Sequence, residues 1–259
     1  DFVPSRGLGD VYKRQTPTQA ISTFNAHADF PLPSLSKAQM AELAAGQVVK
    51  VLERGGSEDA WRATGILVTS QPRDAIWLAC QDPHFSFVDR ATEKRLAKSG
   101  DRSTWYAYLD LPRPMSDRHW AVDVWNNHAL AAATDGAAWE HAWKLNPDGE
   151  AMVRPLVAAG EVGALTTEML DGAVYTPVNN GAWVVIALSE ERTLLAYHAA
   201  TEVGGNIPER LVAEFTLGGM EKLLRRIEER AGDGIREHYT GTHAPLAGGD
   251  GAALPLFTE

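Results

Sequence analysis

Apolar and polar residues alternate with a period of two along several short segments, and this pattern constrains the fold more than any other feature. In residues 103–111, Trp105 and Leu109 fall on one side of an extended segment and Tyr106 falls on the other. Such alternation is typical of an antiparallel sheet whose two faces have different surroundings. The ranges predicted as strands are 47–54, 60–70, 93–98, 103–111, 119–130, 137–145, 181–188 and 192–200, with a further strand beginning at Phe85, Phe87 and Val88.

A long amphipathic helix is predicted after the last strand, over residues 208–231. Gly204-Gly205-Asn206 interrupts the strand before it, and Pro208 suits a helix start. The apolar residues recur every three or four positions, so they form one stripe that the fold must bury. The pair Gly218-Gly219 predicts a bend or an interruption within the helix. The stripe consists of Val212, Phe215, Met220, Leu223, Leu224 and Ile227.

Two shorter helices are predicted nearer the N-terminus. Ser36, followed three residues later by Gln39, forms a capping-box pattern at the start of a helix that ends near Gly46. Pro72 opens a second helix over 73–80. The order of elements is short helix, two strands, short helix, a longer run of strands and a long helix. This order indicates an α+β domain in which the last helix covers a strongly curved antiparallel sheet.

Residues 1–15 are predicted not to belong to the natural protein. The string SRGLGDVYKRQ at 5–15 is similar to a translated transposon-end sequencing adapter, and the alternative is a genuine basic arm. Segments of this kind are left out of fold reasoning. We therefore expect the natural N-terminus to be missing, which leaves the compartment open between cytoplasm and export.

The rest of the chain divides by composition. Residues 16–35 contain three prolines (17, 31 and 33) and are predicted as an extended lead-in. Residues 36–231 form the predicted domain, within which 150–172 read as an insertion that is partly helical around 161–170. Residues 232–259 are rich in Gly, Ala and Pro and are predicted as a flexible tail.

The charge balance excludes several classes of partner. The 259 residues contain 24 Lys and Arg against 34 Asp and Glu, a formal net charge of −10. An acidic chain lacks the basic face that a general nucleic-acid binder needs, and it is not attracted to anionic lipid headgroups. No apolar run is long enough for a membrane helix, so we expect no stable membrane insertion. The single cysteine, Cys80, excludes an internal disulfide and a cysteine-based zinc cluster.

Several short motifs follow one another in a recognisable order over residues 40–231. The first group surrounds the second predicted strand, the second lies in the middle of the sheet and the third leads into the last helix. They are Trp61 with Gly65-Ile66-Leu67-Val68, Pro72 with Ile76-Trp77, Asp117-Arg118-His119-Trp120, Gly181-Ala182-Trp183, Thr193 to Tyr197, and Gly204-Gly205-Asn206-Ile207-Pro208.

In this order the motifs resemble the helix-grip fold of the START-like, or SRPBCC, superfamily. The resemblance implies a bent antiparallel sheet wrapped around the C-terminal helix, with an elongated apolar cavity between them. It implies binding of a hydrophobic, lipid-like small molecule in that cavity without a cofactor. The ligand-binding residues that it implies are Trp105, Asp117, Arg118, Trp120, Trp183, His198 and Phe215.

Each of these assignments has a structural alternative. The tryptophans line a pocket, or they form the core, as large aromatic residues often do. Asp117 and Arg118 orient a polar ligand head, or they form a salt bridge or a solvated turn. Cys80 lies on an apolar helix stripe and is interpreted as a small buried hydrophobe.

Three functions remain open from the sequence. The first is a non-catalytic carrier or sensor of a hydrophobic molecule. The second is a cyclase, hydratase or hydrolase that uses the same cavity, which requires Asp117 or Asp123 to meet His119, His141 or His198 there. The third is a protein-interaction module with a filled core. The eight histidines lack the spacing of a metal motif, so no metal site is predicted, and the oligomeric state stays open.

Overall fold

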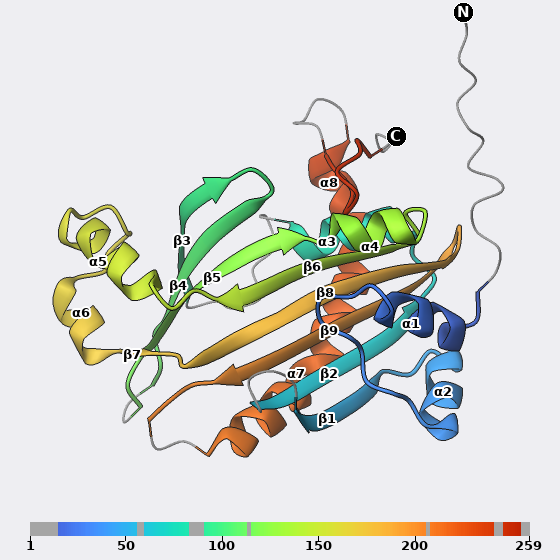
Figure 1. The fold of residues 1–259 in the computed structure, drawn as a ribbon, viewed down its shortest axis with the longest axis horizontal. Coiled ribbons are helices and arrows are strands. Elements are labelled where there is room, and N and C mark those ends of the chain that lie inside the picture. The colour runs from blue at the N-terminus through green and yellow to red at the C-terminus, as the bar shows by residue number, and fades with distance from the viewer. Residues whose placement is uncertain are drawn as a thin grey trace, which may run out of the picture.

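One curved sheet organises the molecule (Figure 1). The computed structural model describes residues 15–55, 60–82, 91–112, 115–205, 208–240 and 246–254. Within these residues nine strands form a single sheet in the order β1-β2-β9-β8-β6-β5-β4-β3, with β7 beside β5. All pairings along this order are antiparallel and only β7 runs parallel to its neighbour. The strands are β1 Val49–Gly55, β2 Ala60–Thr69, β3 Ala91–Ser99, β4 Arg102–Leu109, β5 Arg118–Asn126, β6 Ala138–Leu145, β7 Val174–Tyr175, β8 Val178–Ser189 and β9 Arg192–Glu202.

The long C-terminal helix α7, Glu209–Glu229, crosses one face of the sheet, which we call the inner face. It packs on β1, β2 and β9, and the shorter α3, Arg73–Gln81, packs beside it on β8 and β9. Met220, Leu224 and Ile227 of α7 are buried, as its predicted apolar stripe requires. The predicted α+β architecture of a curved antiparallel sheet with a long C-terminal helix is therefore confirmed.

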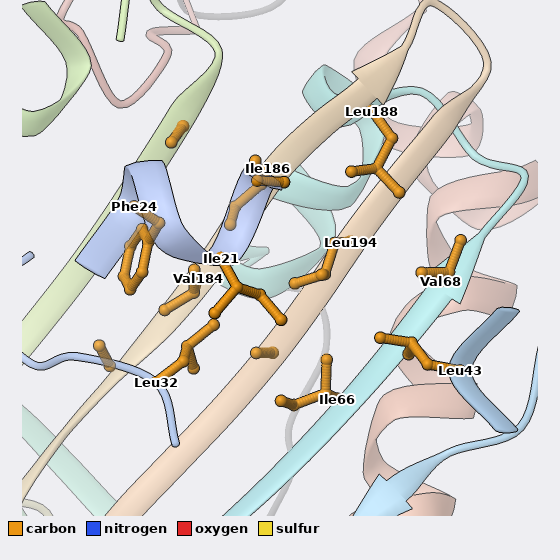
Figure 2. Packing of buried hydrophobic residues seen from close by; sticks show 14 of the residues in the cluster. Ile21, Phe24, Leu32, Leu43, Ile66, Val68, Val184, Ile186, Leu188 and Leu194 are labelled. Atoms are coloured by element: carbon orange, nitrogen blue, oxygen red, sulfur yellow. The ribbon is translucent and has the colours of Figure 1, made fainter. Parts of the chain in front are cut away.

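Two N-terminal helices cover the opposite, outer face of the sheet: α1 Pro17–Asn25 and α2 Lys37–Ala44. Figure 2 shows Ile21 and Phe24 of α1 among Val184, Ile186 and Leu194 of the two central strands. Burial of such a side chain contributes about 1.5–3 kcal/mol, so this second core holds the N-terminal helices on the sheet.

The structure corrects the expectation that residues 16–35 are an extended lead-in, because 17–25 are helical. The Thr16 hydroxyl accepts from the Gln19 amide and the Gln19 side chain accepts from the Thr16 amide, which completes a capping box. Pro17 stands in the first turn, where its missing N–H is not needed. The same arrangement at Ser36 and Gln39 confirms the predicted start of α2.

A buried carboxylate on the outer face ties this N-terminal segment to the sheet. Glu140 of β6 is fully buried and accepts hydrogen bonds from the backbone amides of Asp29 and Phe30, each at 2.9 Å. The Asn127 side chain donates to the same carboxylate at 2.8 Å. Three donors on one carboxylate join the segment before α2 to the end of β5.

The middle of the chain contains helices that strand periodicity did not reveal. The predicted strand 119–130 ends at Asn126, and α4, His128–Ala133, follows because the Asn127 side chain caps it by accepting from the Leu130 amide. The insertion 150–172 contains α5, Gly149–Ala158, and α6, Thr167–Gly172, which pack on the outer side of β4 and β5. α7 continues through Gly218-Gly219, and the irregularity falls later, in the π-helical turn η2, Arg230–Gly234.

Residues 235–240 and 246–254 pack on the rest of the structure, in contrast to the flexible tail predicted for 232–259. α8, Ile235–Tyr239, continues from η2, and Asp82 at the end of α3 accepts from Arg230 at 2.7 Å and from Tyr239 at 3.0 Å. Residues 246–254 lie against two inner-face tryptophans: Trp77 donates to the Ala247 carbonyl at 3.2 Å, and Gly249 lies against Trp139. The division at 36–231 stays a prediction, and the expectations for 1–14 and for Phe85, Phe87 and Val88 fall outside the described residues.

Candidate functional site

One row of side chains runs across the inner face of the sheet. Asn126 of β5 pairs with His141 of β6, His141 with Trp183 of β8, Trp183 with Tyr197 of β9 and Tyr197 with Gly65 of β2. Residues directly opposite one another on neighbouring strands point to the same face. We call these five residues the inner row.

Gly65 closes one end of the inner row. A Cβ at Gly65 would lie 3.0 Å from Met220 Cβ and 3.1 Å from Leu224 Cδ1, so α7 rests directly on this strand. The space beneath α7 is therefore solid at β2, and any opening on the inner face lies further along the row, over β9, β8 and β6.

Three aromatic rings occupy that part of the face. The Trp183 and Tyr197 ring centroids are 4.5 Å apart, and Trp143, one step along β6 from the row, is 5.5 Å from Tyr197. The Trp143 Nε1 donates to Asn179 Oδ1 at 3.0 Å, which fixes the indole against the sheet. Gly181 makes this position possible, because a Cβ there would lie 2.6 Å from the Trp143 ring.

The side chain of Tyr197 combines deep placement with remaining accessibility. Desolvation by burial raises the pKa of its hydroxyl to about 12. The residue is nevertheless only half-buried, as are Trp143 beside it and Leu223 on α7. No hydrogen bond to the Tyr197 hydroxyl forms within the described ranges, so this polar atom is open to another partner.

His141, at the other end of the inner row, is held by one hydrogen bond. Its Nδ1 lies 2.7 Å from Asn126 Oδ1, and its ring meets Trp77 edge-on at 6.2 Å between centroids. Desolvation lowers the pKa of the imidazole to about 4, so it is neutral at physiological pH. An amide oxygen only accepts, so Nδ1 carries the proton and Nε2 presents a lone pair.

Four of the predicted site residues lie on the inner face: Trp105, Arg118, Trp120 and Trp183. Strand register places them there, since Trp105 pairs with Val122 and Trp120 with Ala107 on the same side as the inner row. Trp183 belongs to the row itself. Trp105 and Trp120 lie on β4 and β5, beyond the strands that α7 covers, and Trp105 is exposed.

The other three predicted residues lie elsewhere. His198 and Asp117 belong to the outer face by strand alternation, because His198 shares a phase with Leu194 in the outer core and Asp117 bonds to the outer-face Tyr108. Phe215 stands on α7, but its side chain is 86% exposed and points away from the sheet. A single apolar stripe was expected to include Phe215, but the buried stripe of α7 begins with Ala213 instead.

The neighbours Asp117 and Arg118 point to opposite faces and have separate structural partners. Asp117 accepts from the Tyr108 hydroxyl at 2.6 Å and from the Leu111 amide at 2.9 Å. These hydrogen bonds outweigh its desolvation and lower the pKa of the carboxyl. The Arg118 guanidinium donates to the backbone carbonyls of Val203, at 2.5 Å, and Gly204, at 3.2 Å, at the end of β9. Asp117 and Arg118 therefore do not form one polar pair in a cavity.

The acid–base pairs expected for an enzyme do not meet on the inner face, because Asp117, Asp123, His119 and His198 all belong to the outer face. Asp123 accepts from Thr104 on the outer side, and His119 meets the Tyr106 hydroxyl there at 3.2 Å. Of the carboxylates and histidines considered for catalysis, His141 alone is on the inner face. Among the described residues no three His, Cys, Asp or Glu side chains are grouped in a way that could hold a metal ion.

Two residues that define this site, Tyr197 and Trp143, were predicted to lie in strands but were not predicted to bind a ligand. His141 was considered only as one of three histidines for the enzyme alternative. The sequence held no signal for their common face, because the register that places Tyr197, Trp143 and His141 beside Trp183 is formed between separate strands. None of the helices described, all within the ranges given above, is long and apolar enough to cross a membrane.

Comparison with known proteins gives a result at the level of structure. No family model and no curated protein matches the sequence. Human STARD10 superposes with a TM-score of 0.56 at 10% identity, over 88% of this chain and 86% of that one. A STAR-related lipid transfer protein from Xanthomonas axonopodis gives 0.51 at 15% identity, over 71% of this chain and 93% of that one. The chain has the START-like helix-grip fold.

A third START-like structure supports the same assignment. The lipid transfer and protein localization domain of human StarD13 gives a TM-score of 0.51 at 11% identity, over 78% of this chain and all of that one (100%). The resemblance inferred from the motifs is thereby confirmed at the level of fold. α7 packs over the end of the inner row at β2 and β9, and α3 packs on β8 and β9 beside it.

Proposed function

We propose that this protein binds a hydrophobic, lipid-like small molecule between α7 and the inner face of the sheet, beside Trp143, Trp183 and Tyr197. The observation that carries the proposal is the state of Tyr197. Its hydroxyl is desolvated enough to raise the pKa to about 12, yet the side chain keeps accessible surface.

A recess beside the Tyr197 side chain would account for both properties. Desolvation reports that protein surrounds a group on most sides, whereas accessible surface reports that some space beside it is unfilled. His141 shows the same combination, with its pKa lowered to about 4 and its side chain half-buried. A tightly packed core leaves no such surface, because protein interiors are filled to the density of organic crystals.

The lining favours an apolar ligand. Aromatic rings dominate it, and the polar atoms that accompany them are few: the Tyr197 hydroxyl, the His141 imidazole and the Asn179 amide. Binding pockets for small molecules have this composition, with apolar area supplying affinity and a few polar groups supplying orientation. Each square ångström of apolar surface removed from water contributes about 25 cal/mol before the costs of ordering.

The comparisons support the class of ligand. The neighbours from human and from Xanthomonas axonopodis are described as lipid transfer proteins or domains. The helix-grip resemblance implies a ligand under the C-terminal helix, and the inner row lies on the face of the sheet that α7 crosses. Entry of a ligand then requires local opening between α7 and the segments that face it.

Ligand binding is tested on delipidated, refolded full-length protein. Mass spectrometry of the purified protein before delipidation identifies co-purified lipids, and tryptophan fluorescence follows titration with a panel of hydrophobic compounds. Truncation of a buried aromatic side chain removes apolar contact, so Trp143→Ala is expected to weaken binding about tenfold or more.

Trp125→Ala is the matched control. Trp125 is also a half-buried sheet tryptophan, but it lies on the outer face, where it donates to Asp29 at 2.7 Å and packs on Phe30. Its truncation is expected to leave affinity unchanged. A wild-type protein that carries no lipid and shows no response to the panel would overturn the proposal.

A further inference from the structure

The side of α7 that faces away from the sheet carries the two most exposed large apolar side chains of the described structure. Phe215 is 86% exposed, and Leu211, one helical turn earlier, is 57% exposed. They stand on the same side of the helix because four residues make about one turn. Exposed apolar side chains that lie together, rather than singly, mark a surface that another molecule covers.

Two glycines leave a hollow on the same side of α7. Gly218 and Gly219 follow Phe215 by three and four positions, so they lie beside its ring on the helix surface. A Cβ at either glycine meets nothing within 4 Å beyond its chain neighbours and the helix backbone. Glycine is unfavourable inside a helix, and neither of these glycines is needed for contact with the sheet. What they provide is open space next to a projecting aromatic ring.

We propose that this face of α7 is a self-association surface, on which Phe215 of one copy packs into the hollow at Gly218 and Gly219 of a second copy with the two helices antiparallel. An interface with two-fold symmetry requires one face that is complementary to itself, and a ring beside a hollow meets this requirement. The two-fold axis passes near residue 217, between the ring and the hollow. The surface points away from the sheet, so the inference does not depend on the proposed ligand site.

Charges on either side of the axis favour the antiparallel orientation. Glu214 precedes the axis and Lys222 follows it, and both are exposed. At 1.5 Å per residue they lie about 4.5 Å and about 7.5 Å from the axis, so an antiparallel pair brings Glu214 of one copy near Lys222 of the other. Parallel helices would place Lys222 beside Lys222. Glu214 accepts from Arg210 at 2.8 Å within its own helix, whereas Lys222 has no ion pair among the described residues.

A second copy of the chain fits this face better than a membrane does. The face holds only two large apolar side chains, and Glu214 stands beside them. The net charge of −10 repels the anionic lipids that assist docking on membranes. In the antiparallel pair, Leu211 of one copy lies against the aliphatic stem of Lys222 of the other, so both exposed apolar side chains are covered.

The association is tested by sedimentation equilibrium of the full-length protein over a wide concentration range. The contact is small, so the wild type is expected to form a weak dimer with a dissociation constant on the order of micromolar. Phe215→Ser removes the ring, and Gly219→Gln fills the hollow with a polar side chain. Each variant is expected to weaken the dimer about tenfold or more. Met169→Ser is the matched control, because Met169 is 38% exposed on α6, and it should leave the dimer unchanged.

Two further measurements test the orientation of the helices. Glu214→Lys and Lys222→Glu are each expected to weaken the dimer about threefold, and the double variant should restore it because the charges are only exchanged. Cys80 is the single cysteine and is buried, so an introduced cysteine reports the contact. Gly218→Cys lies near the axis and should form disulfide-linked dimers on oxidation. Lys222→Cys should not, since its two copies are separated by about 15 Å along antiparallel helices.

The outcomes decide the inference without reference to ligand binding. A wild type that stays monomeric at every concentration overturns it, and so does a dimer that persists in both Phe215→Ser and Gly219→Gln. Cross-linking through Lys222→Cys, or no rescue in the double charge variant, also overturns it. A monomer that binds neutral phosphatidylcholine vesicles through Phe215 would identify a membrane surface instead. Unfolding in dilute solution, where the wild type is monomeric, should be the same for Phe215→Ser and the wild type, which shows that the variant loses association and not its fold.

Discussion

Substitution of His198 by leucine is expected to stabilise the protein, and most strongly in mild acid. His198 of β9 is fully buried on the outer face, and neither ring nitrogen has a hydrogen-bond partner in the described structure. Thr64, its cross-strand partner, has an unpaired hydroxyl in the same set of residues. An unpaired buried polar group costs about 1–3 kcal/mol, so an apolar side chain of similar volume is favoured at this position.

The pH dependence follows from the pKa of His198. Desolvation, with a smaller contribution from Arg62, lowers the pKa of the imidazole from 6.5 to about 3 in the folded protein. Below pH 6.5 the unfolded chain binds a proton that the folded chain excludes, so stability is complete above this pH and is lost as the pH falls towards 3. The unfolding equilibrium shifts about tenfold per pH unit within that window, which is about 1 to 2 kcal/mol between pH ~8 and pH ~5.5.

Urea unfolding, followed by tryptophan fluorescence at pH ~8 and pH ~5.5, measures both effects. His198→Leu is expected to raise the free energy of unfolding at the higher pH and to lose about 1 to 2 kcal/mol less than the wild type on acidification. His119 and His141, whose pKa values are also lowered by burial, remain in the variant and account for the residual loss. His27→Leu, at an exposed position on the outer side, is the control and should change neither quantity.

A variant less stable than the wild type at pH ~8 would refute the reasoning, because it would mean that the His198 nitrogens make stabilising hydrogen bonds. An unchanged loss on acidification would refute it equally. In that case His198 would not resist protonation in the folded state.

Three further predictions concern single positions. Glu140→Gln turns one carboxylate oxygen into a donor that faces other donors, so it should destabilise the protein by about 1–3 kcal/mol in thermal unfolding. Protease cleavage near residues 26–35 should increase. Unchanged stability would show that the three hydrogen bonds contribute little. Gly181→Ala places a methyl group against the His198 carbonyl oxygen and the Trp143 ring, so it should cost about 1–3 kcal/mol and weaken ligand binding. A variant with wild-type melting would contradict this close approach. Phe215→Ser removes an 86% exposed side chain and should change the free energy of unfolding by less than about 0.5 kcal/mol; a large loss would place Phe215 in a packed environment.

Period-two alternation predicted most of the sheet because each strand has one buried and one differently occupied face. Strands β1, β2, β4, β6, β8 and β9 begin and end close to the predicted limits. The amphipathic stripe likewise predicted α7, and the capping box at Ser36 predicted α2. These signals lie in neighbouring residues, so they could be recognised without knowing which segments pack against one another.

The helices that were missed carried signals of a different kind. α1 begins with Pro17, and the three prolines of residues 16–35 were interpreted as breakers, although a proline in the first turn favours a helix start. The composition of the C-terminal residues predicted flexibility, but the backbone of residues 246–254 packs on Trp77 and Trp139. Contacts between segments far apart in the sequence decided both cases.

The candidate site shows the same division. Alternation placed Trp183 and Tyr197 in strands but left the relative phase of different strands undetermined. The register between strands determines this phase. It places His198 and Asp117 on the outer face and aligns His141 with Tyr197 on the inner face. The position of Phe215 depended on which side of α7 meets the sheet, and an apolar residue within one turn of the buried stripe can still face solvent.

By itself, the sequence determined that this chain alternates as an antiparallel sheet, ends in a long amphipathic helix and is acidic, because these properties reside in neighbouring residues. Only the tertiary structure decided which face meets α7 and which polar atoms meet on it. A shift of one residue in any strand reverses every side chain of that strand, and the backbone pairing that fixes the register is formed between segments that are distant in the chain.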